Sequence, residues 1–369
     1  MLKQINFSIV VPTHGRPDQF FRLAESIARI IKIYQGEIEV IVVDSSQPND
    51  ASAIQHCCDK YRFVYLQDQN HVCKKRNRGI DNASKPYIFF TDSDCRLESD
   101  VFSQHTQTYQ ANNPEIVGVL GLTEITGNQF AIWKHLQYDP SFTAAFNFAR
   151  WLEYAPWGTC TNLSIKKEAL QEVGGFDNQW PLVVYGEDVD LGLRIAQTGK
   201  QIACNPEAVV THDSSNFHSF WRVVQKKWKT GCADFYLGKK HPNMLVYEFP
   251  DWISIFILIL PVMLIQCVRT QSFLPLLLLG GVFVFGILSQ ALIGAIQQDT
   301  PSAWVGVFVS TILENIFVAG RIQEAIKHRT FNRIWKKFVY VQPQLLAERN
   351  RRVAQAWAIV LCMMLLLFF

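Results

Sequence analysis

The chain has 369 residues, a formal net charge of +3 and nine cysteines. A chain of this length holds one large domain or two ordinary ones. The cysteines are odd in number and include no CxxC pair, which argues against a disulfide framework and for reduced thiols that face the cytoplasm. The basic residues cluster beside long apolar runs, which argues against nucleic acid as a partner.

Residues 1–100 alternate between apolar runs and helical patterns. Ile5–Val11 is expected to form the first strand, and Pro17, after the following turn, suits the first position of a helix. In that helix the apolar side chains recur at helical spacing from Phe20 to Ile31. Further strands are expected at Ile38–Val43, Phe63–Leu66 and Tyr87–Phe90, with a basic helix around Lys74–Ala83 before the last of them. The alternation predicts a Rossmann-like, mostly parallel α/β sheet with helices on both faces.

The turn after the first strand reads Pro12-Thr13-His14-Gly15-Arg16. It contains neither a GxGxxG fingerprint nor a P-loop lysine, so a dinucleotide-dependent dehydrogenase and a P-loop NTPase are both disfavoured. Phosphates bound at this turn would need a metal ion and basic side chains to neutralise them.

The run Tyr87–Phe90 is wholly apolar and is followed by two carboxylates, Asp92 and Asp94. Such runs are typical of strands buried on both faces of a parallel sheet, and ligands bind beyond the carboxyl ends of these strands. The two carboxylates would repel each other unless a cation or a hydroxyl-rich ligand lay between them. Taken alone, Asp-x-Asp is more often a turn or a helix cap. With Mg²⁺ commonly held by one or two carboxylates, the pattern predicts a metal-dependent site for a phosphorylated donor.

The second half of the head, residues 101–215, is less regular. Its expected elements are a strand through Trp157–Lys166, helices at Lys167–Glu172 and Glu187–Gln197 with a turn at Gly174–Asp177 between them, and strands at Gln201–Cys204 and Ala208–Thr211, the last ending in His212.

Together these motifs resemble the family 2 glycosyltransferases of the membrane-associated bacterial type, which are inverting enzymes with the GT-A fold. The resemblance covers roughly residues 5–215 and keeps the order of the family's motifs. The matching stretches are Ser8–Thr13, Val40–Asp44, Lys75–Ile80, Thr91–Asp94, Val173–Asp177, Gly186–Leu191 and the strand end at His212.

The resemblance implies a hexosyltransferase that uses a nucleotide-sugar donor, with Asp188 as general base and Glu187 as its neighbour. One base suffices because a divalent metal, rather than a protein acid, stabilises the departing diphosphate. The alternative for both acidic residues is a helix N-terminal cap. The resemblance also makes Asp94 a metal ligand, Asp92 its partner at the ribose or the metal, and His212 a third ligand. A histidine ligand favours Mn²⁺ over Mg²⁺.

The donor's nucleotide, expected to be a uridine diphosphate, should lie against the first two strand ends. By resemblance, Pro12, Thr13 and Arg16 line this part of the site, Asp44 accepts from the base, and Arg76 lies near the base or diphosphate. Arg76 has a solvated helix charge as its alternative. Two tryptophans, Trp157 and Trp180, flank the acceptor half, where they either stack on a sugar or belong to the core.

The C-terminal region contains the apolar runs Trp252–Val268, Phe273–Ala295, Ala303–Gly320 and Ala354–Phe369. A helix of about 20 apolar residues crosses a bilayer, so a multi-pass protein of the cell (inner) membrane is expected, with membrane lipids as partners. Basic segments flank these runs and no signal peptide precedes the first strand, which predicts a cytoplasmic catalytic domain. An even number of crossings is then required before residue 335, and Ala303–Gly320, with its polar stripe, is the run least suited to span. The short, proline-containing run Trp252–Val268 is the other candidate.

The expected domains are a catalytic head at 1–215, divided into a nucleotide-binding half at 1–100 and an acceptor half at 101–215, an amphipathic interfacial segment at 216–250 and membrane helices at 251–369. A lipid-linked or other membrane-proximal acceptor is expected. Two alternatives stay open: a processive polysaccharide synthase, for which Gln225–Trp228 resembles the Gln-x-x-Arg-Trp signature with one residue too few, and a catalytically silent binding subunit.

Overall fold

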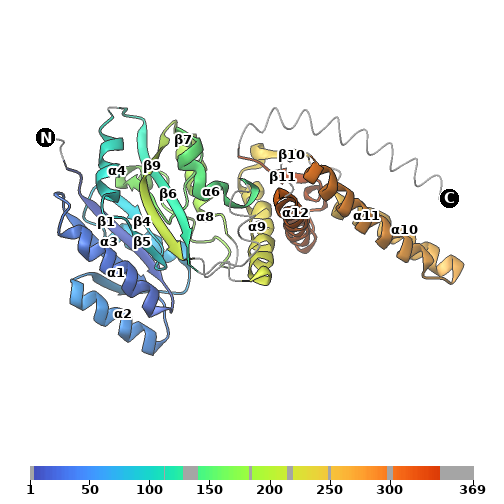
Figure 1. Cartoon of the computed structure of the whole chain (residues 1–369), viewed down its shortest axis with the longest axis horizontal. Helices are drawn as coiled ribbons and strands as arrows, with labels where there is room; N and C mark the ends of the chain where they lie inside the picture. The colour runs from blue at the N-terminus through green and yellow to red at the C-terminus, as the bar shows by residue number, and fades with distance from the viewer. Residues whose placement is uncertain are drawn as a thin grey trace. The chain divides into compact units, whose positions relative to one another are not determined.

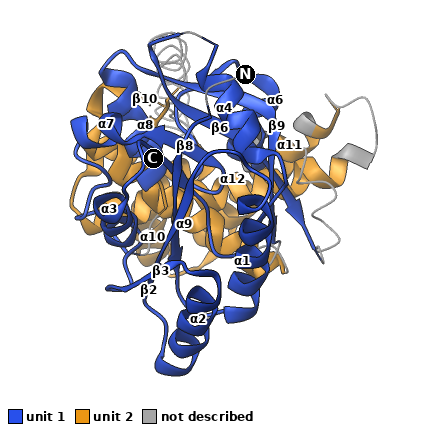
Figure 2. Ribbon diagram, turned by 90° about the vertical axis from the view of Figure 1, so that its left-hand side faces the viewer, with its two compact units in different colours: residues 1–129, 143–183, 187–216 blue, residues 130–142, 184–186, 217–369 orange. Residues whose placement is uncertain are grey.

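The structure is a computed structural model that describes residues 4–111, 113–127, 140–182, 185–213, 219–247, 251–296 and 302–340. The chain divides into two compact units (Figure 2). Unit 1 comprises residues 1–129, 143–183 and 187–216, and unit 2 comprises residues 130–142, 184–186 and 217–369. The last predicted apolar run, Ala354–Phe369, lies outside the described residues.

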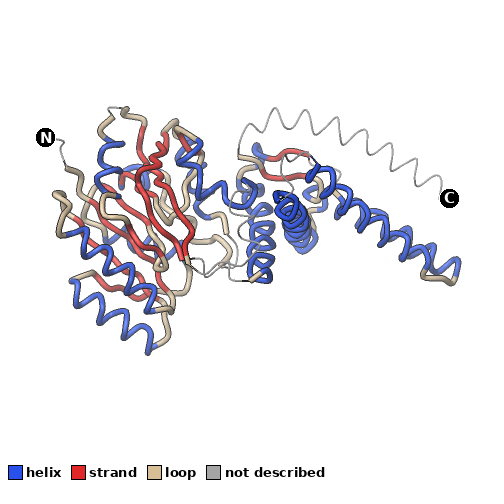
Figure 3. The backbone as a smooth tube through the Cα atoms, viewed as in Figure 1, coloured by secondary structure: helices blue, strands red, loops and turns tan. Residues whose placement is uncertain are grey.

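Unit 1 is built on a mixed, mostly parallel sheet in the order β3-β2-β1-β4-β8-β6-β9-β5, with β7 paired to β9 (Figures 1 and 3). Strands β1 to β4 run parallel, whereas β8 is antiparallel to both β4 and β6. The strands are β1 (Phe7–Thr13), β2 (Ile38–Asp44), β3 (Val64–Gln67), β4 (Tyr87–Phe90), β5 (Cys95–Leu97), β6 (Ile116–Thr126), β7 (Tyr154–Ala155), β8 (Leu163–Lys166) and β9 (Gln201–Asp213).

The helices of unit 1 cover both faces of this sheet. Phe7, Ile9 and Val11 of β1 are fully buried in one apolar cluster with side chains of α1, α2 and α4. The intervening Val10 faces the other way, against α3, where a Cβ on Gly79 would come within 2.3 Å of the valine methyl. The helices are α1 (Pro17–Ile31), α2 (Pro48–Tyr61), α3 (Val72–Asn82), α4 (Val101–Tyr109), α6 (Pro140–Trp151), α7 (Lys167–Glu172) and α8 (Glu187–Gln197).

The predicted fold class is confirmed. The sequence patterns did not predict β5, α4, β6 or α6, and two of the strands that they did predict have other bounds. The strand expected through Trp157–Lys166 is confined to β8, with the separate two-residue β7 before it. The two strands expected at 201–204 and 208–211 form one long strand, β9, whose pairing with β6 shifts register between Gly121 and Leu122. An irregularity of this kind interrupts the alternation of apolar residues, so the sequence resembles two strands.

Unit 2 is helical, with one small sheet. Its helices are α9 (Phe220–Lys240), α10 (Trp252–Thr270), α11 (Leu274–Ile296) and α12 (Ser302–Lys327), and β10 (Leu245–Tyr247) pairs antiparallel with β11 (Lys336–Phe338). Three of the helices, α10, α11 and α12, are long and apolar enough to cross a membrane. Unit 2 is therefore suited to membrane association.

Candidate active site

Polar side chains gather at the carboxyl edge of the unit 1 sheet. The β1–β2 register places Thr13 beside Asp44, and β4 ends at Phe90, two residues before Asp92. Strand β5 then runs antiparallel to β9, with Cys95 opposite His212. This last pairing joins the Asp-x-Asp motif to a histidine more than a hundred residues away along the chain.

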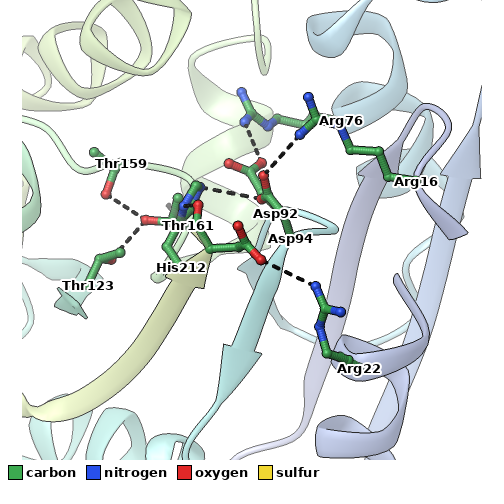
Figure 4. A network of polar contacts seen from close by, with 10 residues as sticks. Arg16, Arg22, Arg76, Asp92, Asp94, Thr123, Thr159, Thr161 and His212 are labelled. Carbon is green, nitrogen blue, oxygen red and sulfur yellow. Dashed lines mark hydrogen bonds and ion pairs between the residues drawn. The ribbon is translucent and has the colours of Figure 1, made fainter. Parts of the chain in front are cut away.

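Asp94 and His212 form the centre of the site (Figure 4). The Asp94 Oδ1 atom lies 3.4 Å from Nε2 of His212, and both side chains are largely buried. The His212 Nδ1 atom lies 2.9 Å from the backbone oxygen of Asp213, which only accepts hydrogen bonds, so Nδ1 carries the proton. Nε2 then faces the Asp94 carboxylate and, in the neutral ring, carries the lone pair that a cation would bind. Backbone bonding at Nδ1 is the usual way to orient a metal-binding histidine, so the pair fits a divalent metal.

Cys95 lies beside this pair. Ligand atoms of Asp94, Cys95 and His212 lie within 4.8 Å of one another. Burial, followed by the nearby charges of Asp92 and Asp94, raises the pKa of the Cys95 thiol well above its ordinary range. Because the thiolate is the form that binds metal, Cys95 is a poor ligand for a hard ion. Asp92 is outside this cluster of three, and its role at the ribose or the metal stays a prediction.

Asp92 is instead held by the buried guanidinium of Arg76. Arg76 donates from Nη1 to Glu187 at 2.7 Å and from Nη2 to Asp92 at 3.3 Å, and its guanidinium lies 5.2 Å from the ring centre of Phe176. Although burial disfavours its charge, the neighbouring anionic groups raise the pKa of Arg76 well above its usual range. Arg76 thus connects α3, the loop after β4 and α8. The alternative, that Arg76 is a solvent-exposed charge on its helix, is wrong because the guanidinium is buried.

Removing this guanidinium should lower the free energy of unfolding of unit 1. Arg76→Met leaves Asp92 and Glu187 without their shared cation in a buried setting, and breaking a buried pair costs about 3–5 kcal/mol. Urea denaturation of the detergent-solubilised protein should show that the free energy of unfolding falls by this amount. A change at the exposed Arg29, whose ion pair with Glu25 lies on the surface of α1, should cost about 0.5 kcal/mol or less. Equal losses for the two variants would contradict the structural role of Arg76.

Asp188 follows Glu187 in the first turn of α8. Its Oδ1 atom accepts a hydrogen bond of 2.9 Å from the backbone N–H of Val189. Burial and then the negative charge of Glu187 raise the pKa of Asp188 to about 7, against the opposing effect of Arg76. A carboxylate with a pKa near neutrality is matched to general-base work at physiological pH.

Glu187→Gln should therefore shift the pH dependence of turnover. The substitution removes the negative charge that raises the pKa of Asp188, so Asp188 should ionise at a lower pH. Since a base acts in its deprotonated form, the acidic limb of the kcat profile should move below the wild-type midpoint near pH 7. The measurement is kcat at saturating donor from pH 5 to 9. An unchanged limb, or one moved upward, would show that Glu187 does not act on Asp188 in this way.

The loops after β1 and β2 are cross-linked by hydrogen bonds around Asp44. Asp44 is fully buried and accepts from the Ser46 hydroxyl at 2.5 Å and from the Tyr65 hydroxyl at 2.9 Å. Ser46 Oγ in turn accepts from the backbone N–H of Gly15 at 2.7 Å. Asp44 therefore shapes the loops that the sequence assigned to the base, and a direct contact between Asp44 and the base stays a prediction.

Lys75 is a site residue that sequence reasoning missed. Its ammonium donates to the Thr13 backbone oxygen at 2.8 Å and to the Ser45 hydroxyl at 2.9 Å. Burial lowers the pKa of Lys75 to about 8, although Asp44 favours the charged form. The signal for its burial was Gly79 at i+4, because a small residue on the same helix face marks close contact with the sheet.

Arg16 places a second guanidinium near the Asp94–His212 pair. Its Nη1 atom lies 3.7 Å from Asp94 Oδ2, and its backbone is left-handed, with φ 56° and ψ 53°. A non-glycine residue in this region costs about 1 kcal/mol, and such strain gathers at functional sites.

The two tryptophans predicted to bind the acceptor are buried, since Trp157 is 8% and Trp180 4% exposed. Trp157 packs on the ring of Phe148, so the core alternative fits both indoles better, and their acceptor role stays a prediction.

Comparison with known proteins identifies the family of the chain. The family model described as "Glycosyltransferase like family 2" matches residues 8–236. The O-antigen biosynthesis protein RfbC of Myxococcus xanthus is 25% identical over an alignment of 227 residues, and the match covers 56% of this chain and 17% of that protein. The glucosyl-dolichyl phosphate glucuronosyltransferase of Haloferax volcanii is 22% identical over 60% of this chain and 76% of its own length.

Among solved structures, the mannosyltransferase PcManGT of Pyrobaculum calidifontis, in complex with GDP-Man and Mn²⁺, matches with a TM-score of 0.52 at 14% identity. The match covers 88% of both chains, and at this identity it supports the fold alone. This chain spans only 17% of RfbC and 23% of the chondroitin synthase of Pasteurella multocida, another relative. The family model, which covers more than half of the chain, is the decisive match: the chain belongs to the glycosyltransferase-like family 2.

Proposed function

We propose that the protein transfers a sugar from a nucleotide-sugar donor to a hydroxyl group of an acceptor near the membrane, with inversion at the anomeric carbon. The observation that carries this proposal is the connected cluster at the sheet edge. The Arg76 guanidinium joins two parts of this cluster. It contacts Glu187, the neighbour of Asp188, at 2.7 Å, and Asp92, which precedes the Asp94–His212 pair, at 3.3 Å. Because Asp188 and Asp94 neighbour the residues that Arg76 joins, we assign both carboxylates to one site.

In this mechanism the acceptor oxygen attacks the anomeric carbon as the bond from that carbon to the diphosphate oxygen breaks. Asp188 takes the proton of the acceptor hydroxyl, and the bond electrons leave with the nucleoside diphosphate. Because attack and departure occur on opposite faces, one base and no covalent intermediate suffice. This differs from glycoside hydrolysis, in which a second carboxyl group protonates the leaving oxygen.

The other residues stabilise the departing diphosphate. Asp94 and His212 would hold a divalent cation, which would supply Lewis-acid stabilisation of the negative charge on the leaving group. The nitrogen of His212 favours Mn²⁺ over Mg²⁺. The Arg16 guanidinium, half exposed beside Asp94, would pair with a phosphate, and Arg76 would keep Asp92 oriented. Thr13, Asp44 and Lys75 shape the loops on which the nucleotide base would rest.

The experiment is a screen of nucleotide sugars in Mn²⁺ for release of nucleoside diphosphate, followed by incubation with membrane lipid extracts. We expect one class of donor to be hydrolysed slowly, to be consumed faster in the presence of an extract, and to become inert in EDTA. Release that is equal for all nucleotide sugars and indifferent to EDTA would contradict the proposal. Intact acidic residues at positions 92, 94 and 188 also favour this activity over that of a silent binding subunit.

A further inference from the structure

The small sheet of unit 2 connects segments on either side of its three apolar helices. Strand β10, which precedes α10, pairs with β11, which follows α12. The pairing is extended by a 2.9 Å bond from the Val339 N–H to the Met244 oxygen, and Asp234 of α9 accepts from the Phe338 N–H at 3.0 Å. Paired strands cannot lie on opposite sides of a bilayer. The chain between them therefore crosses a membrane an even number of times.

Helix α9 shows which face of the membrane this sheet occupies. Arg222, Lys229, Lys239 and Lys240 are exposed along its length, and Trp221 is 66% exposed at its start. A helix with charges from one end to the other does not cross a hydrocarbon layer, whereas basic residues beside an exposed indole are typical of the membrane surface. We therefore place α9 at the surface.

Helix α12 packs beside α9 over several turns. A Cβ on Gly231 would meet the backbone of Phe317 at 2.0 Å, and one on Gly320 would meet the Trp228 backbone at 2.4 Å, so the two helix backbones are in close contact. The charges of α12 are used in this packing. Lys227 lies 2.6 Å from Glu314, and the Tyr236 hydroxyl donates to Glu324 at 2.8 Å. A helix held against α9 in this way lies at the same level as α9.

Helices α10 and α11 have the opposite character. Only 17% of the most apolar stretch of each helix is buried within the protein, against 50% for α12. The two helices are joined by three residues and pack through Phe256 and Phe283, whose ring centres are 5.1 Å apart. Their 19 and 23 residues give lengths of about 28 and 34 Å, which match the ~30 Å hydrocarbon core. Arg269 is their only charged residue and lies beside the turn.

We propose that unit 2 anchors the protein in a lipid bilayer through a single hairpin, α10–α11, whose two ends lie at the same membrane face. Helix α12 then lies against α9 at that face and does not cross. The hairpin turn at Gln271–Phe273 emerges on the opposite face. The basic residues of α9 and of the segment after α12 are gathered at one face, as the distribution of charge in membrane proteins requires of the cytoplasmic side.

The test uses the full chain in membranes, with a short protease recognition sequence inserted at one of three places. The places are the exposed end of α1 between Lys32 and Ile33, the hairpin turn between Gln271 and Ser272, and the loop between Arg329 and Thr330. Protease is added to right-side-out and to inverted sealed vesicles. We expect the first and third insertions to be cut in the same vesicles and the second only in the other.

Two results would overturn the proposal. Cutting at 329/330 in the same vesicles as 271/272 would mean that α12 crosses, and cutting of all three in one preparation would mean that the hairpin does not. Because insertions can disturb folding, the native chain is also labelled with a photoreactive probe dissolved in the lipid. Label should be found along α11, for example at Leu277 and Phe285, whose side chains are 70% and 73% exposed. Equal labelling of the α12 segment Glu314–Arg321 would also overturn the proposal.

Discussion

Asp188→Asn should slow sugar transfer by orders of magnitude while leaving donor binding intact. The amide has nearly the shape of the carboxylate but cannot take a proton, and positioned bases contribute about 10²–10⁴-fold to turnover. We therefore expect kcat to fall by about that factor, with the Kd for the donor changed less than about threefold. The measurement pairs steady-state turnover with calorimetric donor binding in Mn²⁺.

The control for this substitution is Asp59→Asn on the exposed side of α2, which should change neither quantity. Stability supplies a second check. Burial raises the pKa of Asp188 to about 7, so the folded state penalises the ionised form and loses stability as the pH rises through that value. Asp188→Asn should accordingly raise Tm at pH 8 and have little effect on it near pH 4. Wild-type turnover in the variant would end the assignment of Asp188 as the base.

Asp94→Ala should remove the effect of metal on donor affinity. Losing even an outer-shell partner of a metal site costs about 10–100-fold in metal affinity, so loss of a ligand should weaken donor binding in Mn²⁺ by about 100-fold. The wild-type protein should bind the donor more tightly in Mn²⁺ than in EDTA, and the variant should bind it equally weakly in both. Isothermal titration under the two conditions measures this difference.

The neighbouring cysteine provides the matched control. Cys95 is part of the same close cluster, yet burial keeps its thiol protonated, so Cys95→Ser should keep the Mn²⁺ effect. If Cys95→Ser lost the metal effect and Asp94→Ala kept it, the ligand assignment would be wrong.

The strongest local patterns predicted their elements well. The helices at Lys167–Glu172 and Glu187–Gln197 and the strand at Tyr87–Phe90 have the predicted bounds. Each is a short segment with a clear start or end: an apolar run closed by acidic residues, or acidic residues at a helix N-terminus. The parallel strands in residues 1–100 could also be predicted, because alternating strands and helices indicate a parallel sheet.

Contacts made by distant segments were not visible in the sequence. Nothing in the three residues of β5 announces a strand, yet its pairing with β9 is what brings Asp94 to His212. The burial of Lys75 and the ion pair of Arg76 with Glu187 likewise depend on residues 30 and 111 positions away. In unit 2 the polar stripe on Ala303–Gly320 indicated a helix unsuited to lipid, but its partner α9 and the β10–β11 pairing appear only in three dimensions.

The central claim is that a cation held at Asp94 and a base at Asp188 serve the same donor. A structure of the protein with Mn²⁺ and the nucleoside diphosphate of its donor, with data collected at the manganese absorption edge, tests it most directly. We expect one anomalous peak in bonding contact with Asp94, His212 and the diphosphate, with the Asp188 carboxylate facing the space left for the sugar. A peak elsewhere, or a diphosphate bound away from this sheet edge, would contradict it.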